Sequence, residues 1–238
     1  MDVRGGDFMD NSRRLFIAGA GILGVDLFMN GCSKKDDSKE VTAVEDLMRE
    51  HGVLRRALFV YSEAAARLRS DPSKLPPGAL QKTAMLFRTF GEDYHEKGLE
   101  EAYIFPAIKK AGGEAAGYPD ILTLQHQRGR EITDYILSVT RSNNIGAKDA
   151  AQLASALDSL VRMYRPHASR EDTIIFPAWK QALSAEDLDE MNDKFEDIEH
   201  KQFGEDGFEK AVREIGQVEN ELYMSDLGQF TSTIQLLK

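Results

Sequence analysis

Two related stretches decide the fold: HEKGLEEAYIFPA at residues 95–107 and HASREDTIIFPA at residues 167–178. Each begins with a histidine, carries acidic residues in its middle and ends in Ile-Phe-Pro-Ala. When the two are aligned on that common ending, Glu100 falls on Glu171. The chain therefore contains an internal repeat, and each copy carries a histidine and a glutamate, side chains that can bind metals.

The chain around this repeat is predicted to be helical. It is rich in Ala, Leu, Glu, Lys and Arg, and no long stretch alternates between polar and apolar residues. Apolar spacing and breaker residues predict five helices, at 41–70, 78–111, 119–142, 147–182 and 184–215. Short connections predict that the first four form an antiparallel bundle, with the fifth as an additional C-terminal helix. Residues 216–238 would be either a loose tail or a segment that packs back on the bundle.

The repeat extends to the preceding helices. His51 is followed four residues later by Arg55, and His126 is followed in the same way by Arg130. Each half thus supplies one histidine on its first helix and a histidine with a carboxylate on its second. A bundle built from two such halves has an approximate two-fold axis, which suits two similar metal sites in its core. The two arginines would either contact the carboxylates of the site or form surface ion pairs.

The predicted metal ligands are His51, His95, Glu100, His126, His167 and Glu171. A single histidine in a core is usually structural, but four of the five histidines in this chain occupy repeat-related positions. Four imidazoles and two carboxylates suit iron, or alternatively manganese, better than calcium or a structural zinc ion. Two ions sharing six side chains would need bridging carboxylates, solvent or an added ligand. His200 lies outside the repeat and is expected to be a surface or packing residue rather than a ligand.

The second helix has one residue too many between its ligands. His167 and Glu171 are four apart and share a helix face, whereas His95 and Glu100 are five apart, which is about 140° around a regular α-helix. A single-turn π-bulge between residues 95 and 101 would turn Glu100 into the core. Gly98 would tolerate this distortion, and Glu101 would lie outside the core or bridge. In a regular α-helix, Glu96 or Glu101 would be the better ligand.

The order of these ligands resembles the hemerythrin-like (HHE cation-binding) family over residues 41–182. The resemblance implies an antiparallel bundle that holds a non-heme di-iron centre. Members bind oxygen reversibly, sense oxygen or redox state, handle nitric oxide or peroxide, or store and deliver iron. Oxygen carriers of this family typically have a second histidine where this chain has Arg130, so the resemblance disfavours simple oxygen carriage. Tyr94 or Tyr164 could fill that ligand position.

The first forty residues are predicted to be a targeting segment. Arg13 and Arg14 precede an apolar run to Met29 that is too short and glycine-rich for a membrane span and resembles a twin-arginine export signal. Cys32 follows, as in a bacterial lipoprotein. We expect an export signal at 1–31, a tether at 32–40, the bundle at 41–182 and a C-terminal helix and tail at 183–238. A soluble exported protein with another cleavage site, or an uncleaved anchor, are the alternatives.

Composition excludes several classes of protein. The formal net charge is −10, and no basic stripe follows the N-terminal region, which argues against nucleic acid as a partner. A single cysteine cannot form an internal disulfide or hold an iron–sulfur cluster within this chain. Contact with a membrane is expected only through the N-terminal signal or a lipid on Cys32.

Four functions remain in competition. The first is a module that binds or senses oxygen, nitric oxide or a related small ligand at the cell envelope, through two iron ions. The second is a di-iron redox enzyme acting on peroxide or nitric oxide, and the third is iron storage or donation. The fourth, a metal-free interaction protein, is disfavoured by the repeated histidines. No acid–base dyad, nucleophile motif or phosphate loop adds an independent argument for an enzyme.

Overall fold

The computed structural model describes residues 41–141 and 145–232, and all regular structure within these ranges is helical. The elements are α1 (Ala43–Ser70), η2 (Pro72–Lys74), α2 (Pro77–Leu86), η3 (Phe87–Ile104), α3 (Phe105–Ala111), η4 (Glu114–Gly117), α4 (Pro119–Thr140), α5 (Ala147–Arg170), η5 (Glu171–Ile175), α6 (Phe176–Ala182), α7 (Ala185–Phe203), α8 (Gly207–Glu221) and η6 (Leu227–Phe230). Among the described helices, none combines the length and the apolar character that crossing a membrane requires. The predicted export signal, the tether and Cys32 lie outside the described residues.

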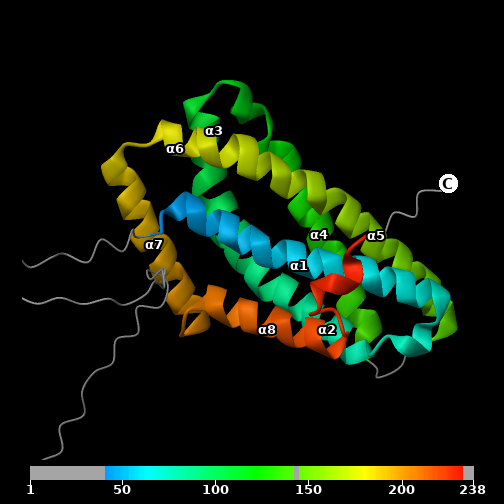
Figure 1. Ribbon diagram of the computed structural model, residues 1–238. Coiled ribbons are helices and arrows are strands. Elements are labelled where there is room, and N and C mark those ends of the chain that lie inside the picture. Colours follow the sequence, from blue (N-terminus) through cyan, green and yellow to red (C-terminus); the bar gives the residue numbers. More distant parts are fainter. Residues whose placement is uncertain (1–40, 142–144, 233–238) are drawn as a thin grey trace, which may run out of the picture. The chain divides into compact units, whose positions relative to one another are not determined.

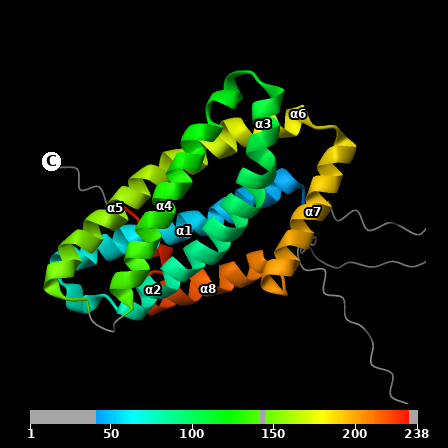
Figure 2. The same ribbon diagram turned by 180° about the vertical axis from the view of Figure 1, so that it is seen from behind.

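Four long helical stretches lie side by side and enclose the core (Figures 1 and 2). They are α1, the continuous stretch α2–η3–α3, α4, and the continuous stretch α5–η5–α6. α1 packs most extensively on α5, α5 packs on α4, and α4 packs on α2 and η3. The two halves of the repeat therefore contribute two stretches each to one helical bundle.

Local sequence sets the ends of these stretches. Asp71 accepts a hydrogen bond from the backbone N–H of Ser73 and so caps η2 directly after α1. Pro77 and Pro119 stand in the first turns of α2 and α4, where a missing N–H removes no intrahelical hydrogen bond. The predicted bounds of the four long stretches are confirmed to within two residues at every end.

The C-terminal part differs from the single helix predicted over 184–215. α7 ends at Phe203, and Gly204 follows with a φ of +67°, a left-handed conformation that side chains with a Cβ rarely adopt. Asp206 then accepts a hydrogen bond from the first turn of α8 and begins a second helix. The prediction of one C-terminal helix was therefore wrong, because Gly204 breaks it into two.

The described part of the chain after residue 215 packs back on the bundle. α8 lies beside α1 and α2 (Figure 1). The ring of Phe230 meets that of Phe59 edge-on, with centroids 4.8 Å apart. At the other end of this layer, Trp179 of α6 stacks on Phe195 of α7 at 5.7 Å. The C-terminal helices thus cover the bundle rather than forming a loose tail.

The core changes character along the bundle. Apolar residues of α5 such as Leu153 and Leu160 fill one half of it and are fully buried. Nearer the α6 end of the same stretch, His167 takes an inward position. In α1 the order is reversed along the chain. The polar residues Glu50 and His51 are buried near its start, and its later buried residues are mostly apolar. The apolar half supplies hydrophobic stabilisation, and the polar half contains the predicted ligands.

Candidate metal centre

A π-helix brings His95 and Glu100 to one side of their stretch. In η3 the carbonyl oxygen of Glu100 accepts a hydrogen bond from the backbone N–H of Phe105, five residues later. This wider turn compensates for the extra residue between the two ligands. The side chains of His95 and Glu100 are both buried, and the His95 Nε2 atom lies 3.4 Å from a carboxylate oxygen of Glu100. The predicted π-bulge, with Glu100 in the core, is therefore confirmed.

The π-helix is much longer than the predicted single turn. η3 runs over 18 residues, although absorbing one extra residue needs only one widened turn. Side chains four residues apart lie on the same face of a helix. Glu92, Glu96 and Glu100 accordingly all face inward and are buried. The sequence pattern did not predict that Glu92 and Glu96 would be buried on the same face as Glu100.

The second half contains a shorter π-helix that the sequence did not predict. In η5, Glu171 accepts a hydrogen bond from the backbone N–H of Phe176, which repeats the relation of Glu100 to Phe105. His167 at the end of α5 and Glu171 still face the same way, with 3.0 Å between the His167 Nε2 atom and the carboxylate. A spacing of four residues fits an α-helix, so no sequence signal marked this widening.

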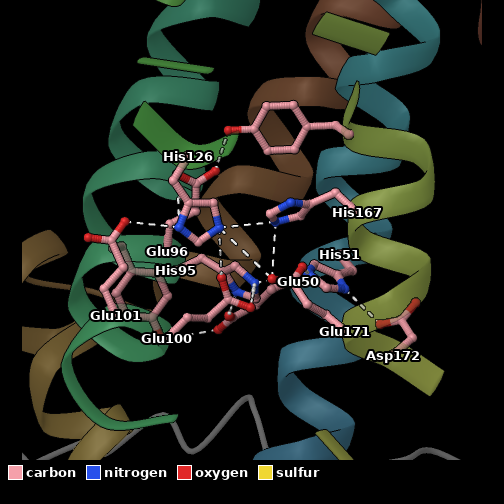
Figure 3. A network of polar contacts seen from close by, with 12 residues as sticks. Glu50, His51, His95, Glu96, Glu100, Glu101, His126, His167, Glu171 and Asp172 are labelled. Atoms are coloured by element: carbon pink, nitrogen blue, oxygen red, sulfur yellow. Dashed lines mark hydrogen bonds and ion pairs between the residues drawn. The ribbon is translucent and has the colours of Figure 1, made fainter. Parts of the chain in front are cut away.

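The structure brings all six predicted side chains together at the centre of the bundle (Figure 3). The histidines form two pairs, and in each pair the two Nε2 atoms are 3.0 Å apart. His51 pairs with His95, and His126 pairs with His167. We call the His51–His95 pair the first position and the His126–His167 pair the second position.

Glu100 and Glu171 each reach both positions. The two oxygens of Glu100 lie 3.4 Å from the Nε2 atoms of His95 and His126. Glu171 places one oxygen 3.5 Å from His51 Nε2 and the other 3.0 Å from His167 Nε2. Each carboxylate therefore lies between the first and the second position, as a bridging ligand does.

This arrangement fits cations. All four oxygens of Glu100 and Glu171 are buried, and none accepts a hydrogen bond from a described residue. Buried carboxylate oxygens without hydrogen bonds are costly unless something positive satisfies them. The four Nε2 atoms point at the same space, and imidazole nitrogens and carboxylate oxygens are the donors that iron and manganese accept. The residues present thus suit metal ions held by nitrogen and oxygen.

Burial sets the protonation of the carboxylates. It raises the pKa of Glu171 to about 8 and that of Glu100 to about 7, and the proximity of Glu171 also raises the pKa of Glu100. Without a neighbouring cation, these carboxyl groups hold protons near neutral pH. A bound cation would displace those protons, so metal binding and proton release are coupled.

Burial acts on the histidines in the opposite direction. It lowers the pKa of His51 to about 3 and that of His167 to about 4, and it lowers the pKa of His126 well below its ordinary value. Burial alone would also lower the pKa of His95, but Glu100 and Glu50 outweigh it and leave that pKa well above the ordinary value. Three imidazoles are thus neutral at physiological pH, as metal ligation requires.

The Nδ1 atoms of His51 and His126, on the side of each ring away from the centre, contact equivalent partners in the two halves of the repeat. The Nδ1 atom of His51 lies 2.7 Å from Asp172, whose carboxylate also pairs with Arg55. The Nδ1 atom of His126 lies 2.9 Å from Glu101, which pairs with Arg130. Each carboxylate fixes its imidazole with Nδ1–H as donor, which leaves Nε2 free to bind a metal.

The two arginines therefore contact carboxylates beside the site, which was one of the two roles open for them. Glu101 is not a bridging group, because it lies on the outer side of His126. Arg130 also lies 3.5 Å from Glu96, so its guanidinium supplies a positive charge between Glu96 and Glu101. These two acids and the Nδ1 atom of His126 form a third group with metal-ligand spacing, but Arg130 already forms ion pairs with both acids.

The remaining two histidines have partners that sequence reasoning missed. The Nδ1 atom of His95 lies 2.6 Å from Glu50, and that of His167 lies 2.8 Å from the side-chain oxygen of Gln125. Glu50 immediately precedes His51, and Gln125 immediately precedes His126. Their equivalent places in the repeat were the one sequence signal that could have indicated this role. A polar residue next to a ligand is, however, more often at the surface.

The tyrosines considered as extra ligands bind carboxylates instead. Tyr94 donates a hydrogen bond to Glu50 at 3.1 Å, and Tyr164 donates one to Glu96 at 2.6 Å. Gly129 permits the second contact, because a Cβ at that position would lie 2.1 Å from the Tyr164 hydroxyl. His200 is exposed and belongs to none of the described groups with metal-ligand spacing, as expected.

A buried set of imidazoles and carboxylates inside packed helices defines the class as a helical bundle with a metal-binding core. The family model described as hemerythrin HHE cation binding domain matches residues 42–179. This chain belongs to that family, whose domains bind metal ions, typically iron. The match contains all six predicted ligands.

Relatives among curated proteins include uncharacterised proteins of Mycobacterium bovis and Mycobacterium tuberculosis. The chain is 44% identical to each of them over 192 residues, which cover 80% of this chain and 74% of the relative. No solved structure matches the chain.

Proposed function

We propose that this protein is a non-heme di-iron protein that binds or senses oxygen, nitric oxide or a related small ligand at the cell envelope. One observation carries the proposal of two ions. Glu100 and Glu171 each extend one oxygen toward the first position and the other toward the second. Two histidines and one oxygen from each carboxylate would hold each ion, in a hemerythrin-like antiparallel four-helix arrangement.

The chemistry of the donors favours iron. Calcium prefers a shell of oxygens, and a structural zinc ion prefers four tight ligands to itself. The shared carboxylates and neutral imidazoles suit a pair of Fe²⁺ or Fe³⁺ ions, with Mn²⁺ as the next candidate. Iron would supply redox chemistry, while the protein residues fix the two positions and exclude bulk water.

The proposed ligands are small because the centre is enclosed. The six side chains that point into it are at most 4% exposed. Four protein donors at each position leave coordination sites that solvent or an added small ligand would complete. Arg130 occupies the place where oxygen carriers of the family typically have another histidine, and it pairs with Glu101 rather than filling the site. This favours a sensing or reactive centre over simple oxygen transport.

The alternative function is a redox enzyme that acts on peroxide or nitric oxide at the same centre. The ligand place taken by Arg130 supports it, since an ion with fewer protein ligands is more reactive. Iron storage or donation is a further alternative, and it would need an acidic route or a partner at the surface.

We also propose that the protein is exported, with a periplasmic or cell-envelope location. This rests on the twin-arginine-like pair Arg13–Arg14 and on Cys32 as a lipid attachment point. Membrane contact would then occur only through this N-terminal region. The acidic net charge of −10 supports the absence of a nucleic-acid partner.

The test is metal analysis of the full chain, purified and reconstituted with Fe²⁺ without oxygen. We expect two iron ions per chain. The matched variants are His167→Ala, which removes a predicted ligand and should lose iron, and His200→Ala, which should retain both ions. One ion or none in the unaltered chain would refute the di-iron proposal.

Optical spectra recorded after addition of oxygen, nitric oxide or peroxide then separate the functions. Bands that form and disappear reversibly support a binding or sensing module. Sustained consumption of peroxide or nitric oxide supports the enzyme.

A further inference from the structure

The two halves of the site differ at one repeat-related pair of residues. Glu50 of α1 and Gln125 of α4 each precede a ligand histidine, and each contacts the ligand histidine of the following long stretch. The acceptor for the Nδ1 atom of His95 is a carboxylate, at 2.6 Å. The acceptor for the Nδ1 atom of His167 is a neutral amide oxygen, at 2.8 Å.

The other outer partners follow the repeat. At the first position Asp172 contacts His51 and pairs with Arg55, and at the second position Glu101 contacts His126 and pairs with Arg130. Both of these histidines therefore have a carboxylate partner and an arginine behind it. The contrast between the two positions is concentrated in the partners of His95 and His167.

The surroundings reinforce this contrast. The Glu50 carboxylate is buried, and Tyr94 holds its second oxygen at 3.1 Å, so that its geometry is fixed. Glu96 is another buried carboxylate near the second position, but it does not act as an additional partner of a ligand histidine there. It lies 4.0 Å from His126 Nδ1, beyond hydrogen-bond distance, and it already accepts a hydrogen bond from Tyr164.

A carboxylate that accepts the Nδ1–H bond makes the imidazole a stronger donor to a metal than an amide does. The effect is large in a buried site because little solvent screens the charge. We infer that Glu50 and Gln125 make the two metal positions unequal. The first position binds its ion more tightly and favours the higher oxidation state, and the second position releases its ion first. This inference rests on the proposed di-iron function.

The experiment exchanges the two partners while leaving every ligand in place. The full chain, the single variants Glu50→Gln and Gln125→Glu, and the double variant are titrated with Fe²⁺ without oxygen, against a chromophoric chelator. For the unaltered chain we expect two binding steps about 10- to 100-fold apart, the range typical for partners of ligand histidines. Each single variant should bring the two steps together, and the double variant should separate them again.

This pattern requires no assignment of a step to a position. A general loss of folding cannot produce steps that merge in both single variants and separate again in the double variant. Gln127→Glu is the matched control, because it adds the same charge at an exposed residue of α4 and should leave the spacing unchanged. Stepwise reduction potentials of the iron-loaded proteins provide a second readout, and their separation should change in the same order.

The outcomes separate this inference from the proposed function. Two bound ions with the same spacing in all four proteins would overturn the inference and leave the di-iron function intact. A chain that binds no Fe²⁺ would overturn both. Merged steps in Glu50→Gln alone, with Gln125→Glu unchanged, would also contradict the inference, because it requires both partners to act.

Discussion

Phe105 donates its backbone N–H to the carbonyl oxygen of Glu100, five residues earlier, where the π-helix η3 passes into α3. This bond belongs to the widening that keeps Glu100 beside His95 despite the extra residue. We predict that deleting Gly98 gives the regular spacing of four found at His167 and retains iron binding. Glu100→Ala should lose most of the bound iron, since it removes the carboxylate that lies between the two positions.

Metal analysis and circular dichroism of both variants check this prediction. Circular dichroism should show that each variant remains helical. Loss of iron in the Gly98 deletion together with retention in Glu100→Ala would mean that Glu100 is not a ligand.

The partner of His51 should matter for affinity. Asp172→Asn replaces a carboxylate that accepts the His51 Nδ1–H bond with an amide, and it leaves Arg55 without its charge partner. We expect iron affinity to fall by about 10- to 100-fold. Asp158→Asn is the control, because Asp158 pairs with Arg69 at the surface and its loss should leave affinity unchanged. Equal affinities for both variants would rule out a role for Asp172.

The metal-free protein should lose stability as pH rises between about 6.5 and 8.5. In this window the unfolded chain has already ionised its glutamates, whereas folded Glu100 and Glu171 release protons only near their raised pKa values of about 7 and 8. Stability conferred by a raised pKa is present at low pH and lost as pH rises through the folded value. His51 and His167 oppose this trend at the acid end of the window, because their pKa is lowered from 6.5 to about 3 and about 4 on folding and the unfolded residues still bind protons there. Above about pH 7.5 they are neutral in both states and contribute no slope.

Iron binding should show the opposite trend in the same window. Fewer protons compete for the carboxylates as pH rises, so the increase in melting temperature caused by iron should grow. Thermal unfolding with and without Fe²⁺, in buffers spanning this window, measures both trends. A metal-free melting temperature that rises with pH would contradict the raised pKa values.

Gly129→Ala should destabilise the bundle. The new Cβ would lie 2.1 Å from the Tyr164 hydroxyl, so Tyr164 must move and its hydrogen bond to Glu96 must change. We expect the free energy of unfolding to fall by about 1–3 kcal/mol, as in other overpacked cores. Gly216→Ala is the control, because its Cβ meets only Arg56 at 3.6 Å and should stabilise α8 by up to about 1 kcal/mol. Denaturant unfolding of both variants decides the matter.

Replacing Arg13 and Arg14 with Lys should retain the protein in the cytoplasm, because the proposed export signal depends on the arginine pair. Mass spectrometry of the native exported chain should find Cys32 acylated at its N-terminus. An intact cytoplasmic chain with an unmodified Cys32 would contradict both parts of the proposed location.

The sequence could predict the helix bounds and the six side chains that meet in the core, because both are encoded locally. The common ending Ile-Phe-Pro-Ala aligned Glu100 with Glu171, and the alignment exposed the extra residue that the π-helix absorbs. Prolines such as Pro77 and Pro119 marked helix starts, because proline is favoured in the first turn, where its missing N–H removes no hydrogen bond.

The rest depends on contacts between helices or on signals that were overlooked. Nothing near Glu50 shows that it meets His95 of another helix, and the same is true of Gln125 and His167. The widening at Glu171 was hidden because a spacing of four suits either type of helix. The break at Gly204 had a local signal, since a glycine followed by an acidic cap often ends one helix and begins another.

Glu100 and Glu171 each extend one oxygen toward each of the two positions, so the centre connects the two halves of the chain. Neither half can complete a position alone, because His51 and His95 need an oxygen from Glu171, and His126 and His167 need one from Glu100. Metal loading would therefore fasten residues 43–111 to residues 119–182. A bound metal would add to the apolar packing that already holds the two halves together, and a half-chain fragment would have histidines but no complete binding site.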